Sequence, residues 1–92
     1  MTLEIHHRPE HQRFEAIVDG HRGVLEYTRS DNEVAMNSVR VPDEIGGRGV
    51  AGALTRRALD CARDNEWRVM PRCPYVRSWI ERHPEYGDLV AE

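Results

Sequence analysis

Apolar and polar side chains alternate along the first forty residues, in the period-two pattern of half-buried β-strands. Four alternating runs are separated by short polar turns, and Asp19-Gly20 is the strongest turn signal because this dipeptide favours a two-residue hairpin. The predicted strands are Thr2–Arg8, Arg13–Val18, His21–Arg29 and Glu33–Val41. The short turns between consecutive strands predict antiparallel pairing.

Beyond residue 48 the apolar spacing changes to three and four residues, which is the spacing of an amphipathic helix. This helix is expected over about Gly49–Asn65, with charged side chains opposite its apolar stripe. The stripe consists of Val50, Ala51, Leu54, Ala58, Cys61 and Ala62. A short apolar run predicts a strand at Trp67–Pro71, and a proline suited to a first helical position predicts a second helix over about Pro74–Arg82. Asp88–Glu92 is expected to be a tail.

The order of these elements predicts an α/β (α+β) fold. A long helix between the fourth and fifth strands allows those two strands to run parallel, as one βαβ crossover. The other strands are joined by short turns, so the sheet is mostly antiparallel. The chain has 92 residues, and we therefore expect one minimal domain over residues 1–92, built from this sheet and two main helices.

The segment between the fourth strand and the first helix carries the strongest chemical signal. Its glycines let the backbone turn tightly and leave the N–H groups uncovered by Cβ atoms. The first turn of the following helix adds unpaired N–H groups and the positive end of the helix dipole. A phosphate or pyrophosphate fits such a place. The alternative is a glycine-rich turn that binds nothing.

Two common phosphate-binding motifs can be rejected. Gly47, Gly49 and Gly52 match the GxGxxG pattern of dinucleotide-binding folds, in which the glycines follow the strand almost directly. Here Pro42–Ile45 intervenes, and no acidic residue occupies the next strand to hold a ribose. A P-loop needs Gly-Lys followed by Ser or Thr, and this chain contains no lysine.

Four short motifs occur in the C-terminal two thirds of the chain. They are Val41-Pro42-Asp43-Glu44, Gly47-Arg48-Gly49, Pro71-Arg72-Cys73-Pro74-Tyr75 and His83-Pro84-Glu85-Tyr86. In this order and at this chain length they resemble the very short, cysteine-containing branch of the GCN5-related N-acetyltransferase (GNAT) superfamily. The resemblance covers roughly residues 33 to 90. It implies a GNAT-like sheet, with acetyl-CoA or coenzyme A (CoA) as the substrate and an unidentified amine or thiol as the acceptor.

The resemblance also implies where the cofactor binds. Backbone N–H groups of the glycine loop would hold the CoA pyrophosphate, and the loop residues are Gly46, Gly47, Arg48, Gly49, Val50, Ala51 and Gly52. In the superfamily the two strands beside the crossover helix splay apart, and pantetheine would pair there with the backbone of Val39 and Val41. Two positions depart from the usual pattern. Gly46 replaces a Gln or Arg, and Ser38-Val39 replaces a frequent His-Thr.

Two residues are candidates for catalysis. Cys73 precedes Pro74 at a helix start, where the dipole and neighbouring arginines favour a thiolate, so it could accept the acyl group. Its other interpretation is a small apolar residue in the core. Tyr75 could donate a proton to the leaving thiolate, or pack at the core edge. The five histidines form no metal-ligand pattern, so no metal is expected.

Composition narrows the class of protein. The net charge of −3 disfavours nonspecific binding of nucleic acid, which needs a basic face. No apolar run approaches the ~20 residues of a membrane span, and Met1–His7 lacks a secretory signal. We therefore expect a cytoplasmic protein with no membrane partner and with Cys61 and Cys73 reduced. It could be a monomer or a homodimer.

Three functional hypotheses follow from these observations. The first is an acetyl-CoA-dependent N-acetyltransferase that works mainly by positioning the thioester and polarising its carbonyl. The second is a module that binds CoA or acyl-CoA without efficient turnover. The third is a small interaction domain whose glycine loop is purely structural.

Overall fold

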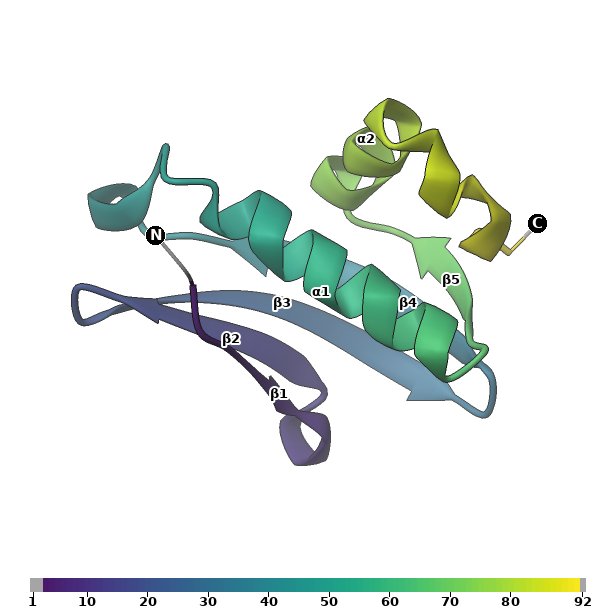
Figure 1. Ribbon diagram of the computed structural model, residues 1–92. Coiled ribbons are helices and arrows are strands. Elements are labelled where there is room, and N and C mark those ends of the chain that lie inside the picture. Colours follow the sequence, from purple (N-terminus) through teal and green to yellow (C-terminus); the bar gives the residue numbers. More distant parts are fainter. Residues whose placement is uncertain (1–2, 92) are drawn as a thin grey trace.

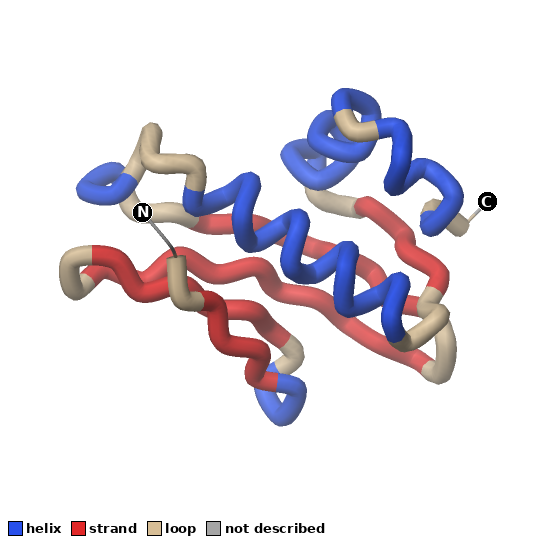
Figure 2. The backbone as a smooth tube through the Cα atoms, viewed as in Figure 1, coloured by secondary structure: helices blue, strands red, loops and turns tan. Residues whose placement is uncertain are grey.

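The computed structural model describes residues 3–91 and has two layers, a five-stranded sheet and the helices that cover one of its faces (Figure 1, Figure 2). The strands follow one another across the sheet in chain order. They are β1 (Ile5–Arg8), β2 (Arg13–Val18), β3 (His21–Ser30), β4 (Glu33–Arg40) and β5 (Arg68–Pro71). Strands β1 to β4 pair antiparallel, whereas β5 pairs parallel with β4.

Two α-helices and three short 3-10 helices complete the fold. They are α1 (Val50–Asp64), α2 (Pro74–Arg82), η1 (Pro9–His11), η2 (Asp43–Ile45) and η3 (Pro84–Leu89). Helix α1 is the crossover between β4 and β5, so the predicted α/β fold with a mostly antiparallel sheet and two main helices is confirmed. Within residues 3–91, no helix is long and apolar enough to cross a membrane.

Two predicted boundaries were wrong. The first strand begins at Ile5 rather than Thr2, and Thr2 itself lies outside the described residues. The C-terminal segment is not a tail, because Leu89 is buried and Val90 forms a parallel bridge with Val69 of β5. The apolar residues Leu89 and Val90 therefore hold the C-terminal segment against the edge of the sheet. Glu92 lies outside the described residues.

A β-bulge in β4 decides which side chains of that strand face the helices. The register with β3 shifts between Glu26 and Tyr27, which leaves Asn37 as an extra residue in β4. Met36 lies before the bulge and Val39 after it, and both pack against the core although their positions differ by three. An unbroken period of two would turn Val39 to the opposite face. The bulge therefore keeps the end of β4 apolar on the side of α1.

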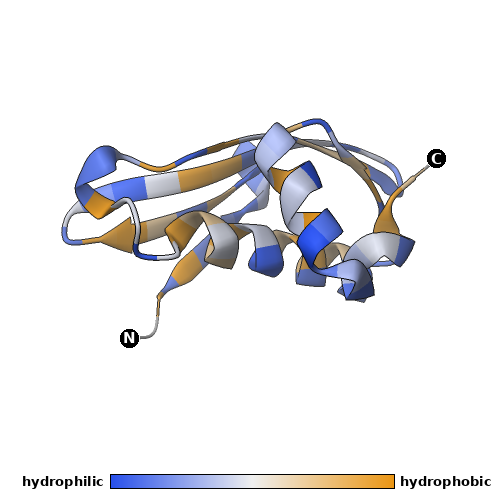
Figure 3. Cartoon of the chain, turned by 90° about the horizontal axis from the view of Figure 1, so that it is seen from above, coloured by the Kyte–Doolittle hydropathy of each residue, from blue (hydrophilic) through white to orange (hydrophobic). Residues whose placement is uncertain are grey.

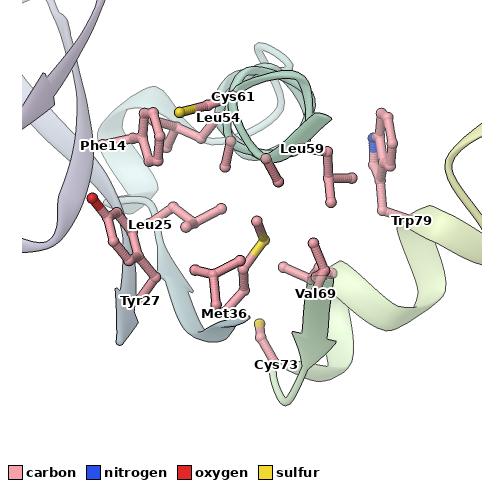
Figure 4. Close-up of a cluster of buried hydrophobic side chains, with 14 of the residues drawn as sticks. Phe14, Leu25, Tyr27, Met36, Leu54, Leu59, Cys61, Val69, Cys73 and Trp79 are labelled. Carbon is pink, nitrogen blue, oxygen red and sulfur yellow. The ribbon is translucent and has the colours of Figure 1, made fainter. Parts of the chain in front are cut away.

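The core lies between the sheet and the two helices (Figure 3, Figure 4). The predicted apolar stripe of α1 is largely buried, and it also includes Thr55 and Leu59. The Thr55 hydroxyl donates to the carbonyl of Ala51 at 2.9 Å, which satisfies the polar group in the core. Gly23 lies under the start of α1, and a Cβ atom there would be only 3.0 Å from Val50 Cγ1. This close approach sets the height of the first turn of α1 above β3.

Trp79 joins α2 to the C-terminal segment. Its ring stacks on His83 at a centroid distance of 3.7 Å and lies 5.2 Å from the ring of Tyr86. His83 Nδ1 lies 2.8 Å from the carbonyl oxygen of Trp79, so the ring occupies the C-terminal end of α2, as expected for a histidine that caps a helix.

Glu15 is a buried carboxylate on the opposite face of the sheet, and it makes folding sensitive to pH. Burial by itself raises the pKa of Glu15, but hydrogen bonds from Arg13 and Arg8 outweigh burial and hold this pKa below the ordinary value of 4.5. A depressed carboxyl pKa stabilises the folded state above the ordinary value, and this contribution is lost as the pH falls through the lower folded value. We expect the urea midpoint to drop between pH 5 and pH 3. The slope should be shallower in Glu15→Gln, and an equal slope in both proteins would contradict this assignment.

Candidate functional site

The glycine loop links β4 to α1 and holds its backbone in conformations that favour glycine. Gly47 has a φ of +76° and Gly49, the N-cap of α1, has a φ of +79°. A Cβ atom at either position would meet no other atom within 4 Å, so the space around these glycines is open. Left-handed backbone geometry, rather than crowding, therefore explains why glycine suits both positions.

The N–H groups at the start of α1 are available to a ligand. The N–H of Ala53 donates to the carbonyl of Gly49 at 3.0 Å, which is the first bond of the helical pattern. The N–H groups of Val50, Ala51 and Gly52 precede it and have no acceptor within the helix. They carry the positive end of the dipole of a 15-residue helix. An anion at this end of α1 would accept these hydrogen bonds.

Anchors on both sides keep the loop in place. Ile45 is fully buried, and the N–H of Gly46 donates to the carbonyl of Asp43 at 3.0 Å. The guanidinium of Arg48 forms an ion pair with Asp19 in the hairpin between β2 and β3. Arg48 therefore reaches across to a neighbouring turn, and its positive charge is already partnered there. Its backbone, rather than its side chain, is the part directed to the helix start.

The first turn of α1 faces two polar side chains of α2. The Tyr75 hydroxyl and the Trp79 indole nitrogen each lie 3.5 Å from the position that a Cβ atom on Gly52 would occupy. Both groups can donate a hydrogen bond. Donors from two helices therefore meet beside Gly52. Tyr75 was one of the residues predicted for the site, whereas Trp79 was not. Tyr75 and Trp79 are four residues apart in a predicted helix, so the sequence could have placed both side chains on the same face of it.

Strands β4 and β5 separate before the end of β4. Their parallel register ends at Met36 and Pro71. The next two N–H groups, of Arg72 and Cys73, both donate to the carbonyl of Met36, at 3.1 and 3.0 Å. The chain then turns away into α2, and the remainder of β4 pairs with β3 on one side only. Val39 and Val41 follow the separation point, on the stretch of chain that leads to the glycine loop.

Cys73 occupies the N-cap position of α2, as the sequence predicted. Its thiol is buried and points into the core beside Met36 (Figure 4). Such burial is typical of a cysteine that packs as a small apolar side chain. Arg77 donates to the carbonyl of Pro71 at 3.2 Å, so its charge is directed to the backbone of the same turn.

Tyr86 has a different role from Tyr75. Its hydroxyl donates to Asp60 at 2.7 Å and accepts a hydrogen bond from Arg56 at 3.3 Å. Burial, together with the hydrogen bond to Asp60, raises the pKa of Tyr86 above its ordinary value. The phenolic proton of Tyr86 is thus committed to a structural contact between α1 and η3. Arg56 is exposed on α1 but also packs over the rings of Trp79 and Tyr86.

A hollow of about 590 Å³ lies at the far end of α1, and its lining includes His7, Cys61 and Trp67. It is lined by none of the loop glycines. Among the described residues, no group of three or more His, Cys, Asp or Glu side chains is arranged to hold a metal ion.

The sequence profile of the GCN5-related N-acetyltransferases matches residues 13–89. Because this match spans most of the chain, the protein belongs to that family. The family generally uses acetyl-CoA as its acyl donor, and its fold is that of acetyltransferases.

Individual relatives agree with this assignment. A GCN5-like protein from Staphylococcus aureus, solved by NMR, superposes with a TM-score of 0.74 at 26% identity, covering 97% of this chain and 88% of its own. The protein NATD1 of Xenopus tropicalis is 24% identical over 86 residues, which are 90% of this chain and 79% of that protein. NATD1 of Mus musculus is 25% identical over 85 residues, 89% of this chain and 77% of its own.

Proposed function

We propose that this protein is an acetyl-CoA-dependent N-acetyltransferase with an amine as the acceptor. The CoA pyrophosphate would bind the backbone N–H groups of the loop, residues 46 to 52. Pantetheine would then run along the free side of β4 by Val39 and Val41, toward the point where β4 and β5 separate. The thioester would lie near this point.

The observation that carries the proposal is the convergence of donors beside Gly52. The Tyr75 hydroxyl and the Trp79 indole nitrogen lie beside Gly52 in the first turn of α1, where the N–H groups have no acceptor within the helix. A structural turn needs no such surplus of donors, whereas a doubly charged pyrophosphate accepts many hydrogen bonds. The positive φ values of Gly47 and Gly49 aim the loop backbone at the same end of the helix.

Catalysis at this site would rest on orientation more than on side-chain chemistry. The acceptor amine attacks the thioester carbonyl carbon, the carbon–sulfur bond breaks, and CoA leaves as a thiolate that takes up the proton lost by the amine. Backbone N–H groups on the free side of β4 would stabilise the negative charge on the carbonyl oxygen during attack. The Tyr75 hydroxyl, which lies beside Gly52, would relay the proton to the thiolate.

Isothermal titration calorimetry with CoA tests the binding part of the proposal, because a structural loop predicts no heat of binding. A screen for free CoA released from acetyl-CoA in the presence of small primary amines and thiols then tests turnover. Binding with release above the uncatalysed rate supports the transferase. Binding without release supports a module that binds CoA without turnover. Two observations favour this alternative: Cys73 is buried, and Ser38-Val39 replaces the frequent His-Thr.

The two cysteines distinguish covalent from direct transfer. As a nucleophile, the Cys73 thiolate would attack the thioester, release CoA and then pass the acetyl group to the amine. This route predicts that Cys73 reacts with iodoacetamide much faster than Cys61 near neutral pH, that CoA protects it, and that acetyl-CoA adds one acetyl mass. Cys61 is a suitable comparison because its side chain is buried to a similar degree and lines a hollow of about 590 Å³. Full transferase activity in Cys73→Ala would leave direct attack as the mechanism.

A further inference from the structure

The face of the sheet that the helices leave uncovered has a basic hollow of about 400 Å³. Its floor is Val24 in the centre of β3, and part of its wall is Val41 and Pro42. Val24 pairs with Glu15 on one side and with Arg40 on the other. The floor is therefore apolar, whereas its neighbours on both adjacent strands are charged.

A buried carboxylate fixes the arginines on one side of this hollow. Glu15 has a side-chain exposure of only 7% and accepts charged contacts from three guanidinium groups. Arg13 and Arg22 both reach its Oε2 atom, and Arg8 reaches Oε1 at 3.4 Å. Burying a carboxylate is costly unless it is paired, so these contacts hold the guanidinium groups in position. Arg22 is one of these groups, so it loses less freedom when a second anion arrives.

The hollow keeps a positive charge after these contacts are counted. Arg13, Arg22 and Arg40 line it together with Glu26, which leaves a net charge of +2 in a chain whose total is −3. The neighbouring ion pair of Arg8 and Glu15 adds no net charge. Arg22 and Arg40 have exposed side-chain fractions of 54% and 65%. Each guanidinium has five N–H donors and uses few of them on the glutamates. Donors and charge therefore remain for a ligand.

We propose that this hollow binds a dicarboxylate, with its two carboxylates on Arg22 and Arg40 and its carbon chain over Val24. Arg40 pairs with Val24, and Arg22 lies two residues before it on the same face. The two arginines are thus diagonal neighbours about 7–8 Å apart across the strands. The forks of their side chains match planar carboxylates, and the charge of −2 balances the hollow.

The apolar floor is the reason to favour an organic dicarboxylate over inorganic phosphate. Phosphate could bridge the arginines but would leave Val24 and Pro42 in contact with water. A short hydrocarbon chain between the carboxylates covers this surface and gains hydrophobic free energy. Two sources offer this chemistry, a free dicarboxylate or a protein segment with acidic side chains two residues apart. Val41 borders both this hollow and the proposed CoA site, but Arg22 and Arg40 are not among the proposed CoA contacts, so the hollow does not depend on CoA binding.

NMR titration with glutarate tests the proposal on the full chain. Saturable shifts are expected at the amides of residues 22, 24 and 40 and at the Nε–H signals of Arg22 and Arg40. In Arg22→Gln/Arg40→Gln, affinity should fall tenfold or more, while Arg13 and Arg8 still neutralise Glu15 and keep the sheet folded. The control Arg57→Gln/Arg82→Gln removes the same charge from the helix side and should bind as the wild type does.

Two further titrations identify the ligand. If inorganic phosphate binds as tightly as glutarate, the dicarboxylate assignment is wrong. It is also wrong if glutarate causes no saturable shift, or if Arg22→Gln/Arg40→Gln binds glutarate as tightly as the wild type does. A capped Glu-Ala-Glu peptide that binds more tightly than glutarate would place the carboxylates on a protein partner. Equal or weaker binding by this peptide would identify a free dicarboxylate.

Discussion

Replacement of Gly49 by glutamate is expected to weaken CoA binding by tenfold or more, about 1.4 kcal/mol, while the protein stays folded. Gly49 is the N-cap of α1, so the new carboxylate lies where the pyrophosphate would bind and repels it. The same carboxylate is favourable for the helix itself, because acidic groups stabilise helix N-termini. Charge therefore affects cofactor affinity and helix stability in opposite directions at this position.

Gly49→Gln is the matched control for this experiment. Glutamine has the size of glutamate and suffers the same strain, about 1 kcal/mol, at a φ of +79°, but it has no charge. Calorimetric titration with CoA and urea denaturation should be measured on both variants. We expect the glutamate variant to be at least as stable as the glutamine variant and to bind CoA more weakly. Equal affinity in two folded variants would exclude the loop as the pyrophosphate site.

Removal of the Trp79 side chain should cost about 3–5 kcal/mol of folding free energy, as for other buried aromatic residues. Trp79 is buried, stacks on His83, contacts Tyr86 and receives the guanidinium of Arg56 at 5.2 Å. The Trp79→Ala variant would therefore lose contacts to α1, α2 and η3 together. For a domain whose total stability is of the order of 5–15 kcal/mol, this is a large share.

The second tryptophan gives the comparison for this prediction. Trp67 is only partly buried and has the guanidinium of Arg29 over its ring at 4.8 Å. Trp67→Ala removes the same number of atoms from a position near solvent, so its effect on the urea midpoint should be clearly smaller. If both variants lose the same free energy, Trp79 does not join the two helices and the C-terminal segment in the way that we describe.

Local patterns predicted most of the elements because their physical causes are local. The hairpin at Asp19-Gly20 forms since both residues adopt positive φ values, of 50° and 78°. Helix α1 begins after Gly49 and ends before Asn65, where the amide side chain donates to the carbonyl of Cys61. Helix α2 begins at Pro74, as the proline predicted. Each of these signals lies within a few residues of the feature that it determines.

Features that depend on distant segments could not be predicted in this way. The bulge at Asn37 offsets β4 by one residue, and it arises from pairing with β3 and not from the residue itself. The meeting of Tyr75 and Trp79 with Gly52 depends on how α1 and α2 approach each other. The arginines around Glu15 come from β1, β2 and β3. In the alternating pattern they are visible only as polar positions, with no sign that they meet.

The parallel pairing of β4 and β5 has a consequence for the order in which the molecule folds. Val34 pairs with Val69, 35 residues further along the chain, whereas Val18 pairs with His21 across a hairpin. Loop closure over the longer distance costs more entropy, so nearby pairs form early and distant ones late. The four-stranded meander can therefore assemble before β5, α2 and η3 dock. The proposed cofactor site lies between the part that folds early and the part that folds late. We expect hydrogen exchange to detect a local opening in which β5, α2 and η3 detach while the amides of the meander remain protected.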